Sequence, residues 1–186
     1  PICGKPIPAE VLRQIGDKCD GVPLFIEELT KAVLESGLLI DRGDHFEMAQ
    51  PTLPPTIPVT LQDSLTARLD RMGAAKELLQ LAAALGRRFI YELLAAVAAI
   101  DEHTLRERLG KLVAGELIYR EPTPRHEAFK FKHALIQDTA YSSMLKATRK
   151  SIHERIALVL EERFPETAEI QPELLARHFE EAMTLD

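Results

Sequence analysis

The sequence is poor in the residues and patterns that mark metal binding, disulfide stabilisation or a membrane span. Its 2 cysteines, Cys3 and Cys19, form no Cys-x-x-Cys pair and have no suitably spaced histidine partner. That usage is typical of free thiols in a reducing compartment. No apolar run approaches the roughly 20 residues of a membrane helix, and no signal peptide opens the chain. We therefore expect a cytoplasmic protein with no membrane segment.

The chain also lacks a phosphate-binding loop and a recognisable catalytic set. Gly4-Lys5 has neither the preceding glycine nor the following hydroxyl of G-x-x-x-x-G-K-[ST]. The 6 histidines contain no His-Glu-x-x-His pattern and no closely spaced pair, so no metal site is expected. The acidic pairs Glu27-Glu28 and Glu161-Glu162 fall on helix faces predicted to be solvated. We do not expect this chain alone to hydrolyse ATP, and whether its parent protein is an enzyme stays open.

Net charge −6 and a pI near 5.6 argue against non-specific binding of nucleic acid or acidic membranes over the whole surface. With 46% hydrophobic residues, 186 residues suit one large domain or two small ones. The chain begins at Pro1, and its final residues run within an apparent helix. We therefore expect a piece of a longer protein.

Residues 1–72 read as helices, a small hairpin and a proline-rich connector. Helices are predicted at 8–18 and 24–36, the second ending at Gly37, and a hairpin at 38–48. The prolines of 51–58 predict an extended connector, because residues before proline avoid the helical region. Thr60 and Asp63 form a capping box for a helix that runs to residue 72.

Residues 73–145 have the order of a winged helix, three helices and then a β-hairpin. The predicted helices cover 75–85, 91–98 and 101–113, and the predicted strands cover 117–121 and 127–132. Residues 146–186 follow as antiparallel helices, predicted at 149–164 and from 171 onward, which could begin a repeat array. The expected fold class is mainly α.

The stretch from Phe129 to Tyr141 changes its apolar period from two residues to the helical spacing near His133. This places the imidazole where a strand feeds the first turn of a helix, a position at which free N–H groups and the helix dipole favour anions. His133 is therefore a candidate phosphate-binding residue. The same position also suits a strand-end histidine that is capped by its own backbone.

A winged helix raises the possibility of DNA binding. The predicted recognition helix, 101–113, carries three cations that its acidic residues nearly balance, and the hairpin adds further cations. The cations in question are Arg106, Arg108, Lys111, Arg120, Arg125, Lys130 and Lys132. Because mixed charge on an exposed helix is usually a solvated face, we keep a DNA-binding module only as the alternative.

Several segments, in order, resemble the region after the phosphate loop in STAND-type signal-transduction ATPases, an AAA-like branch of the P-loop group. The segments are Asp20–Leu29, similar to the family's GNPLFLEEL, Ile57–Met72, Ala82–Phe89, Phe131–Tyr141, Ile152–Ala157 and Gln171–Phe179. The resemblance implies a helical lid fragment in residues 1–72, a winged helix in 73–145 and the start of TPR-like repeats in 146–186. It covers nearly the whole chain.

The resemblance also implies roles for three residues. Gly21 and Pro23 match the Gly-x-Pro turn that lies against the nucleotide base. His133 matches the winged-helix histidine that reaches the terminal phosphate of bound ADP. The residue after it, Ala134, differs from the Asp of better-studied relatives.

The function that the resemblance implies is regulatory. ATP or ADP would bind to the P-loop core of the parent protein, with no nucleotide held tightly by this chain. The nucleotide state would be coupled to an output domain such as an adenylate or guanylate cyclase, and the helical repeats would contact protein partners. The alternative is the winged-helix DNA-binding module of a LuxR-type transcriptional regulator. A third possibility is a passive scaffold.

Overall fold

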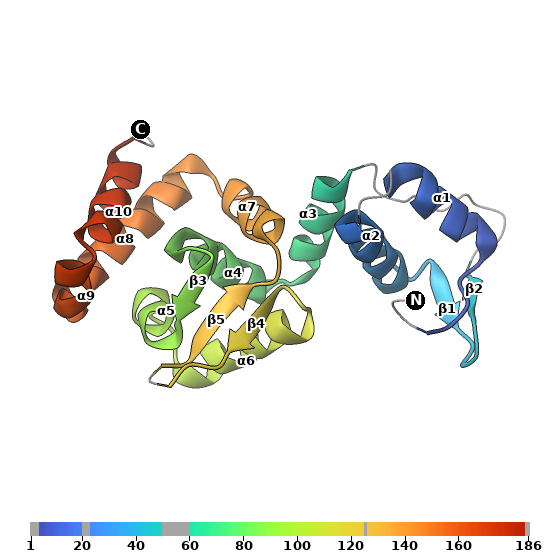
Figure 1. The fold of residues 1–186 in the computed structure, drawn as a ribbon, viewed down its shortest axis with the longest axis horizontal. Helices are drawn as coiled ribbons and strands as arrows, with labels where there is room; N and C mark the ends of the chain where they lie inside the picture. The colour runs from blue at the N-terminus through green and yellow to red at the C-terminus, as the bar shows by residue number, and fades with distance from the viewer. Residues whose placement is uncertain (1–3, 20–22, 50–59, 125, 185–186) are drawn as a thin grey trace. The chain divides into compact units, whose positions relative to one another are not determined.

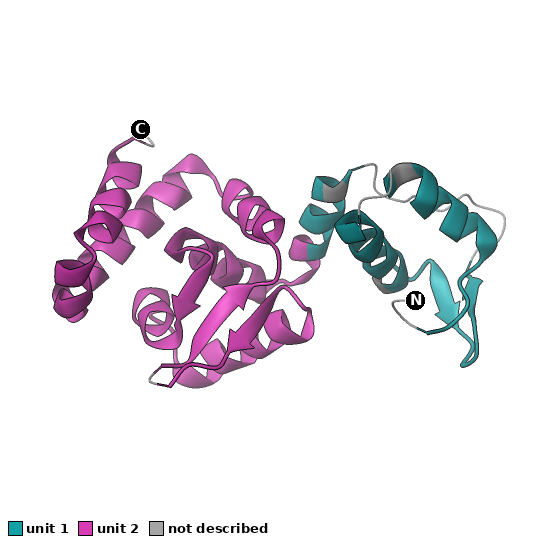
Figure 2. Cartoon of the chain, viewed as in Figure 1, with its two compact units in different colours: residues 1–68 teal, residues 69–186 magenta. Residues whose placement is uncertain are grey.

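A computed structural model describes residues 4–19, 23–49, 60–124 and 126–184 of the chain. The chain divides into two compact units, unit 1 with residues 1–68 and unit 2 with residues 69–186 (Figure 2). The described residues form ten helices and five short strands (Figure 1), so the prediction of a mainly α fold is confirmed. Within this part of the chain, no helix combines the length and the apolar character needed to cross a bilayer.

Unit 1 contains two helices, a hairpin and most of a third helix. Its elements are α1 Ala9–Cys19, α2 Pro23–Glu35, β1 Leu39–Asp41, β2 Phe46–Met48 and α3 Leu61–Arg71. The strands pair antiparallel, with Ile40 opposite Glu47. The predicted cap of α3 is confirmed, since the Asp63 N–H donates to the Thr60 hydroxyl at 3.0 Å. The proline connector, Cys3 and Gly21 lie outside the described residues.

The core of unit 1 forms where α1 and α2 pack against each other and against the hairpin. Apolar residues three or four apart share a helix face, which is why this face of each helix is buried. The buried members are Val11, Ile15, Cys19, Leu29, Val33 and Leu39. Cys19 is a buried core residue, and this burial raises the pKa of its thiol.

The prediction that Glu28 lies on a solvated face of α2 is wrong. Its side chain is buried, and it forms an ion pair with Arg68 of α3, which is also buried. The apolar period of α2 identifies the side that packs against α1. It does not identify the second buried side, where Glu28 meets Arg68. The neighbouring Glu27 is half-buried and pairs with Lys31 at 2.7 Å.

Unit 2 begins with the winged-helix order of elements. These are α4 Ala74–Leu85, β3 Arg88–Ile90, α5 Tyr91–Ala98, α6 Glu102–Ala114, β4 Ile118–Glu121 and β5 Ala128–Phe131. The strands form an antiparallel sheet in the order β3-β5-β4. The three helices and the hairpin match the predicted arrangement, while β3 was not predicted. Gly73 precedes α4 with φ 55°, a conformation that glycine adopts without strain.

The central strand β5 carries two fully buried aromatic side chains, which belong to the core of unit 2. Phe129 lies opposite Phe89 of β3, with ring centroids 5.9 Å apart, and Phe131 lies opposite Ile118 of β4. On the helical side, the Asp101 carboxylate accepts the Thr104 N–H at 2.9 Å, which confirms the predicted cap of α6.

Four helices complete unit 2: α7 Ala134–Ser142, α8 Lys146–Arg163, α9 Pro165–Ile170 and α10 Pro172–Thr184. Helix α10 packs along α8, and α8 also packs against α4 and α5. The winged helix and the last helices therefore share one compact unit. The predicted boundaries after residues 72 and 145 stay predictions, and the short helix α9 was not predicted.

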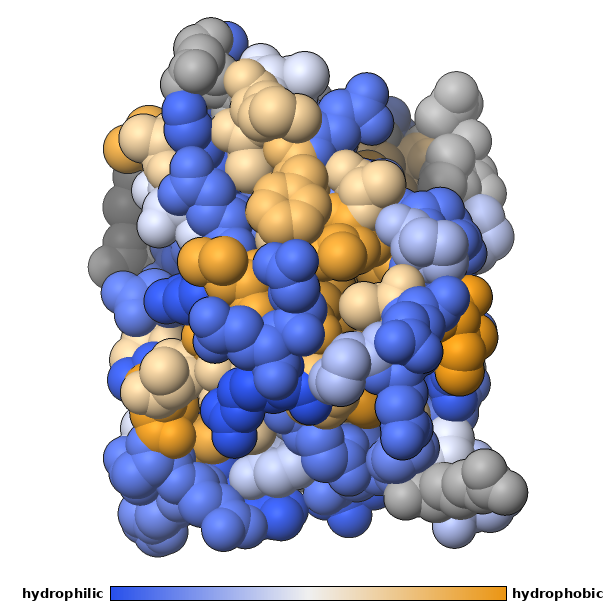
Figure 3. Space-filling view, turned by 90° about the vertical axis from the view of Figure 1, so that its left-hand side faces the viewer, coloured by the Kyte–Doolittle hydropathy of each residue, from blue (hydrophilic) through white to orange (hydrophobic). Residues whose placement is uncertain are grey.

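The end of unit 2 at which α8, α9 and α10 lie has an apolar area bordered by polar side chains (Figure 3). Four large apolar side chains of these helices are exposed, namely Leu158, Ile170, Phe179 and Met183. Scattered exposed apolar residues are normal on protein surfaces, whereas a contiguous area can mark an interaction surface.

Candidate functional site

His133 lies where the central strand of the sheet passes into a helix, as the sequence predicts. It follows β5 and is the N-cap residue of α7, with φ −135° and ψ 147°. The residue before it is still fixed to the sheet, because the Lys132 N–H donates to the Leu117 carbonyl oxygen at 3.0 Å. The Ile136 N–H donates back to the His133 carbonyl oxygen at 3.2 Å.

The His133 imidazole does not cap its own helix. The side chain is partly exposed, and it accepts no hydrogen bond from the first turn of α7. Its Nε2 atom is enclosed and has no hydrogen-bond partner among the described residues. The first turn of α7 contains no acidic residue either. An enclosed ring nitrogen without a partner is unfavourable by about 1–3 kcal/mol. A turn of the ring that brings Nε2 to the surface would let an external donor or acceptor remove that cost.

The other two predicted site residues cannot be related to His133. Gly21 lies outside the described residues. Pro23 is exposed and is the first residue of α2, a position that suits proline because its missing N–H is not needed there. Pro23 belongs to unit 1 and His133 to unit 2, so their roles at a nucleotide stay predictions.

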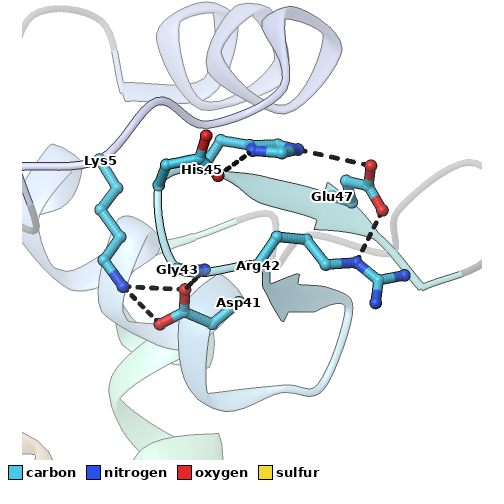
Figure 4. Close-up of polar contacts among 7 residues, drawn as sticks. Lys5, Asp41, Arg42, Gly43, His45 and Glu47 are labelled. Carbon is cyan, nitrogen blue, oxygen red and sulfur yellow. Dashed lines mark hydrogen bonds and ion pairs between the residues drawn. The ribbon is translucent and has the colours of Figure 1, made fainter.

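A surface network of charged residues surrounds the hairpin of unit 1 (Figure 4). The Lys5 ammonium donates to both carboxylate oxygens of Asp41 at 2.7 and 2.8 Å, and Arg42 Nε donates to Glu47 at 2.9 Å. The Lys5 ammonium holds the pKa of the Asp41 carboxyl below its ordinary value. His45 lies between Asp44 and Glu47, and these carboxylates raise its pKa. These groups bind one another at the surface, where such ion pairs stabilise a fold only slightly.

A second polar cluster, which the sequence did not reveal, is buried in unit 2. His153 of α8 and His178 of α10 are 3% and 1% exposed, and their Nδ1 atoms are 2.8 Å apart. The Tyr141 hydroxyl of α7 lies 2.9 Å from His153 Nε2 and 3.4 Å from a Glu181 oxygen. At the other end, Arg177 lies 3.4 Å from His178 Nε2. The cluster joins α7, α8 and α10.

The protons of this cluster have one consistent arrangement. Arginine only donates, so His178 Nε2 accepts from Arg177 and its Nδ1 carries the proton. His153 Nδ1 then accepts, and its Nε2–H donates to the Tyr141 oxygen. The Tyr141 hydroxyl is left to donate to Glu181. Every member is satisfied only while both histidines are neutral, because two protonated rings cannot share the Nδ1···Nδ1 contact.

The electrostatics of the cluster favour these neutral forms. Burial, with the positive charges of Arg177 and of any charged His153, lowers the pKa of His178 to about 3. Burial also lowers the pKa of His153, against the opposing effect of Glu181. Burial raises the pKa of the Tyr141 hydroxyl. A cluster in which both histidines and the tyrosine are neutral and bonded, with Arg177 and Glu181 at its two ends, is a structural connection between helices.

Most of the cations that suggested DNA binding are occupied by nearby carboxylates. On α6, Arg106 pairs with Glu102 at 2.9 Å and Lys111 pairs with Glu107 at 2.8 Å. On the hairpin, Arg120 pairs with Glu127 at 2.7 Å, and Lys132 pairs with Glu116 at 3.0 Å. Of these four residues, Arg120 lies in β4, and Glu116, Glu127 and Lys132 lie beside the ends of the two strands. Arg125 lies outside the described residues.

Within the described ranges, no group of three histidine, cysteine, aspartate or glutamate side chains lies close enough to hold a metal ion. The 25 residues that separate His153 from His178 explain why the sequence did not indicate their pairing. The available signal was weak: His178 falls on the apolar side of a predicted helix, and His153 follows the buried Ile152. Their partnership depends on how α8 packs against α10.

The fold and the site define the class of protein. It is a mainly α chain with a winged helix, in which Nε2 of the histidine after the central strand has no partner among the described residues. No protein-family model matches the chain. The chain is similar to an uncharacterized protein of Rhizobium meliloti (strain 1021), with 28% identity over 163 residues. The match covers 87% of this chain and 15% of that protein, so the chain spans a small part of the relative's length.

Proposed function

We propose that the chain is a regulatory part of a STAND-type ATPase, in which the winged helix couples the ADP or ATP state of a P-loop core to an output domain. The observation that carries the proposal is the partly exposed His133, whose Nε2 has no hydrogen-bond partner among the described residues. An oxygen of an ADP phosphate, presented by a neighbouring ATPase core, would supply that partner once the ring turns and brings Nε2 to the surface. The output domain would be a nucleotide cyclase or a comparable effector.

The switch follows from a contact that exists in one state only. With ADP bound, the His133 contact would hold the winged helix against the core, and exchange for ATP or partner binding would release it. Such a contact biases an equilibrium only by the difference in its free energy between the two states. A hydrogen bond to a charged phosphate contributes about 1.5–3 kcal/mol, enough to change occupancy by more than tenfold. The break at Gly73 between α3 and α4 is a place for the required motion.

The DNA-binding alternative gains no support from the side-chain contacts. DNA binding draws much of its affinity from counter-ions that free cations release from phosphates. Four of the cations considered for that role are ion-paired: Arg106, Lys111, Arg120 and Lys132. A cytoplasmic location and protein partners on the C-terminal helices belong to the regulatory proposal.

The proposal is tested on the full-length parent protein by the rate at which bound ADP dissociates. His133→Ala should speed ADP release at least tenfold, because one charge-assisted hydrogen bond is lost. His103→Ala, at an exposed position on α6, is the matched control and should leave the rate unchanged. An unchanged rate in His133→Ala would favour a passive scaffold. Specific retardation of promoter DNA at moderate salt would instead support the transcriptional regulator.

A further inference from the structure

A hollow of about 690 Å³ lies in unit 2, and His133 is not among the residues that line it. Helix α4 packs against both α6 and α8, and α5 packs against α8. The hollow is therefore a groove whose floor is α4. One wall is α8, and the other wall is formed by the end of α5, the α5–α6 connection and α6. It is open to solvent, and its volume lies within the usual range of ligand sites.

The lining combines apolar and polar side chains, and the floor and both walls contribute residues of each kind. The apolar members include Leu78 and Leu81 of α4, Ile100 before α6, and Ile152 of α8. The polar members are Glu77, Gln80, Arg108, Thr148, Ser151 and Arg155. Two guanidiniums and one carboxylate line the groove, which therefore carries a net positive charge although the whole chain is acidic.

Neither arginine of the groove forms a close polar contact with another described residue, although the charge of Arg108 helps to lower the pKa of the adjacent Glu107. Among the described residues, Arg108 and Arg155 have no hydrogen bond, ion pair or ring contact. The reason is local, because no acidic residue stands three or four positions from either one on its helix. On the same helix as Arg108, by contrast, Arg106 and Lys111 each have a glutamate four positions earlier and pair with it.

Helix α8 adds uncharged donors along its wall. Thr148 and Ser151 lie on successive turns of the face that ends at Arg155, and neither hydroxyl is hydrogen-bonded to another described residue. The first turn of α8, which contributes Ala147, follows Leu145, an N-cap residue that cannot supply a side-chain acceptor. The α8 wall of the groove thus presents hydrogen-bond donors from the first turn of the helix to the guanidinium of Arg155.

These observations favour a peptide over a nucleotide or nucleic acid as the occupant. Single-stranded nucleic acid is usually held by aromatic side chains on which the bases stack. None of the described residues that line the groove is aromatic. Carboxylates match unpaired guanidiniums through paired hydrogen bonds, and apolar side chains match the apolar residues of the lining.

We propose that the groove between α4, α6 and α8 binds an acidic protein segment, with Arg108 and Arg155 each holding a carboxylate and the apolar residues of the lining holding a side chain between them. This interaction does not depend on the nucleotide switch. It gives the helical half of the chain a specific docking position for a partner.

The test uses the 186-residue chain and an array of synthetic dodecapeptides in which the number of glutamates rises from none to six among leucine, alanine and serine. Retention should rise with glutamate content. In solution, Arg108→Gln and Arg155→Gln should each weaken the best peptide about tenfold, as expected for one charge-assisted contact. Arg163→Gln, which removes the same charge from an exposed position on α8, should change affinity less than twofold.

Three results would overturn the proposal. The first is the absence of saturable binding up to about 1 mM peptide. The second is equal weakening by all three arginine variants, which would indicate unspecific attraction. The third is competition by oligothymidylate with tighter binding and the same dependence on Arg108 and Arg155, which would assign the groove to nucleic acid. Circular dichroism of each variant checks that α8 remains folded.

Discussion

Acid should destabilise unit 2 through the buried histidines well before its carboxylates titrate. The folded pKa of His178 is about 3, below the value of about 6.5 expected in the unfolded chain. A group with a depressed folded pKa stabilises the fold fully above its unfolded pKa. Below that value the unfolded chain binds a proton that the folded chain rejects. The contribution of His178 is therefore complete above about pH 6.5 and falls as the pH drops toward 3.

The expected size of the effect follows from the same two pKa values. Between pH 7.5 and pH 5, the free energy of unfolding should fall by about 2 kcal/mol from His178 alone. His153 adds a loss of the same sign, because its pKa is also lowered. His45, whose pKa is raised, acts in the opposite direction but belongs to unit 1.

Urea denaturation followed by tyrosine fluorescence measures this loss in the correct unit. All three tyrosines of the chain, Tyr91, Tyr119 and Tyr141, belong to unit 2, and the chain has no tryptophan. His178→Gln removes the titrating ring but keeps a polar side chain, so the acid-induced loss should shrink by about 2 kcal/mol. The absolute stability at pH 7.5 is a separate quantity, since any buried substitution lowers it.

His103→Gln, at an exposed position, is the control and should reproduce the pH dependence of the parent chain. The reasoning fails if the stability of the parent chain is flat between pH 7.5 and pH 5. It also fails if the unfolding free energy of His178→Gln falls between pH 7.5 and pH 5 as much as that of the parent chain, because the titrating group would then be another residue.

Three further substitutions test other parts of the fold. Glu28→Gln leaves the buried Arg68 guanidinium facing a neutral amide and should cost about 3 kcal/mol, seen as faster hydrogen exchange in α2. The double variant with Glu28→Leu and Arg68→Met should recover most of this lost stability. An unchanged rate of hydrogen exchange in Glu28→Gln would contradict the prediction. Asp101→Ala should lower unfolding free energy by about 1 kcal/mol through loss of the bond to the Thr104 N–H, whereas Asp101→Asn should be nearly neutral. Ala99 has φ 52°, so Ala99→Gly should stabilise unit 2 by about 1 kcal/mol in thermal denaturation, and a lower melting temperature would refute the strain.

Much of the local structure could be predicted because it depends on neighbours in the sequence. The caps at Thr60 and Asp101 form as their spacing indicates, and the helix that ends before Gly37 is where its apolar period places it. His133 takes the predicted position because the change of period at that point is unambiguous. Nearest-neighbour rules were sufficient for these features.

The features that were missed depend on contacts between distant segments. Strand β3 has three residues, too few for an alternating pattern, and exists because β5 pairs with it. Glu28 resembles any solvated helix residue until Arg68 is brought against it. His153 and His178 meet only through the packing of α8 on α10, so no motif contains both.

Strand β5 lies between β3 and β4 and ends at Phe131, two residues before His133. Its edges are bonded on both sides up to that end, where Phe131 donates to the Arg87 carbonyl and Lys132 to that of Leu117. The imidazole is thus carried by backbone that is hydrogen-bonded on both sides up to the preceding residue. A molecule that binds the imidazole would therefore lose little entropy in ordering the backbone.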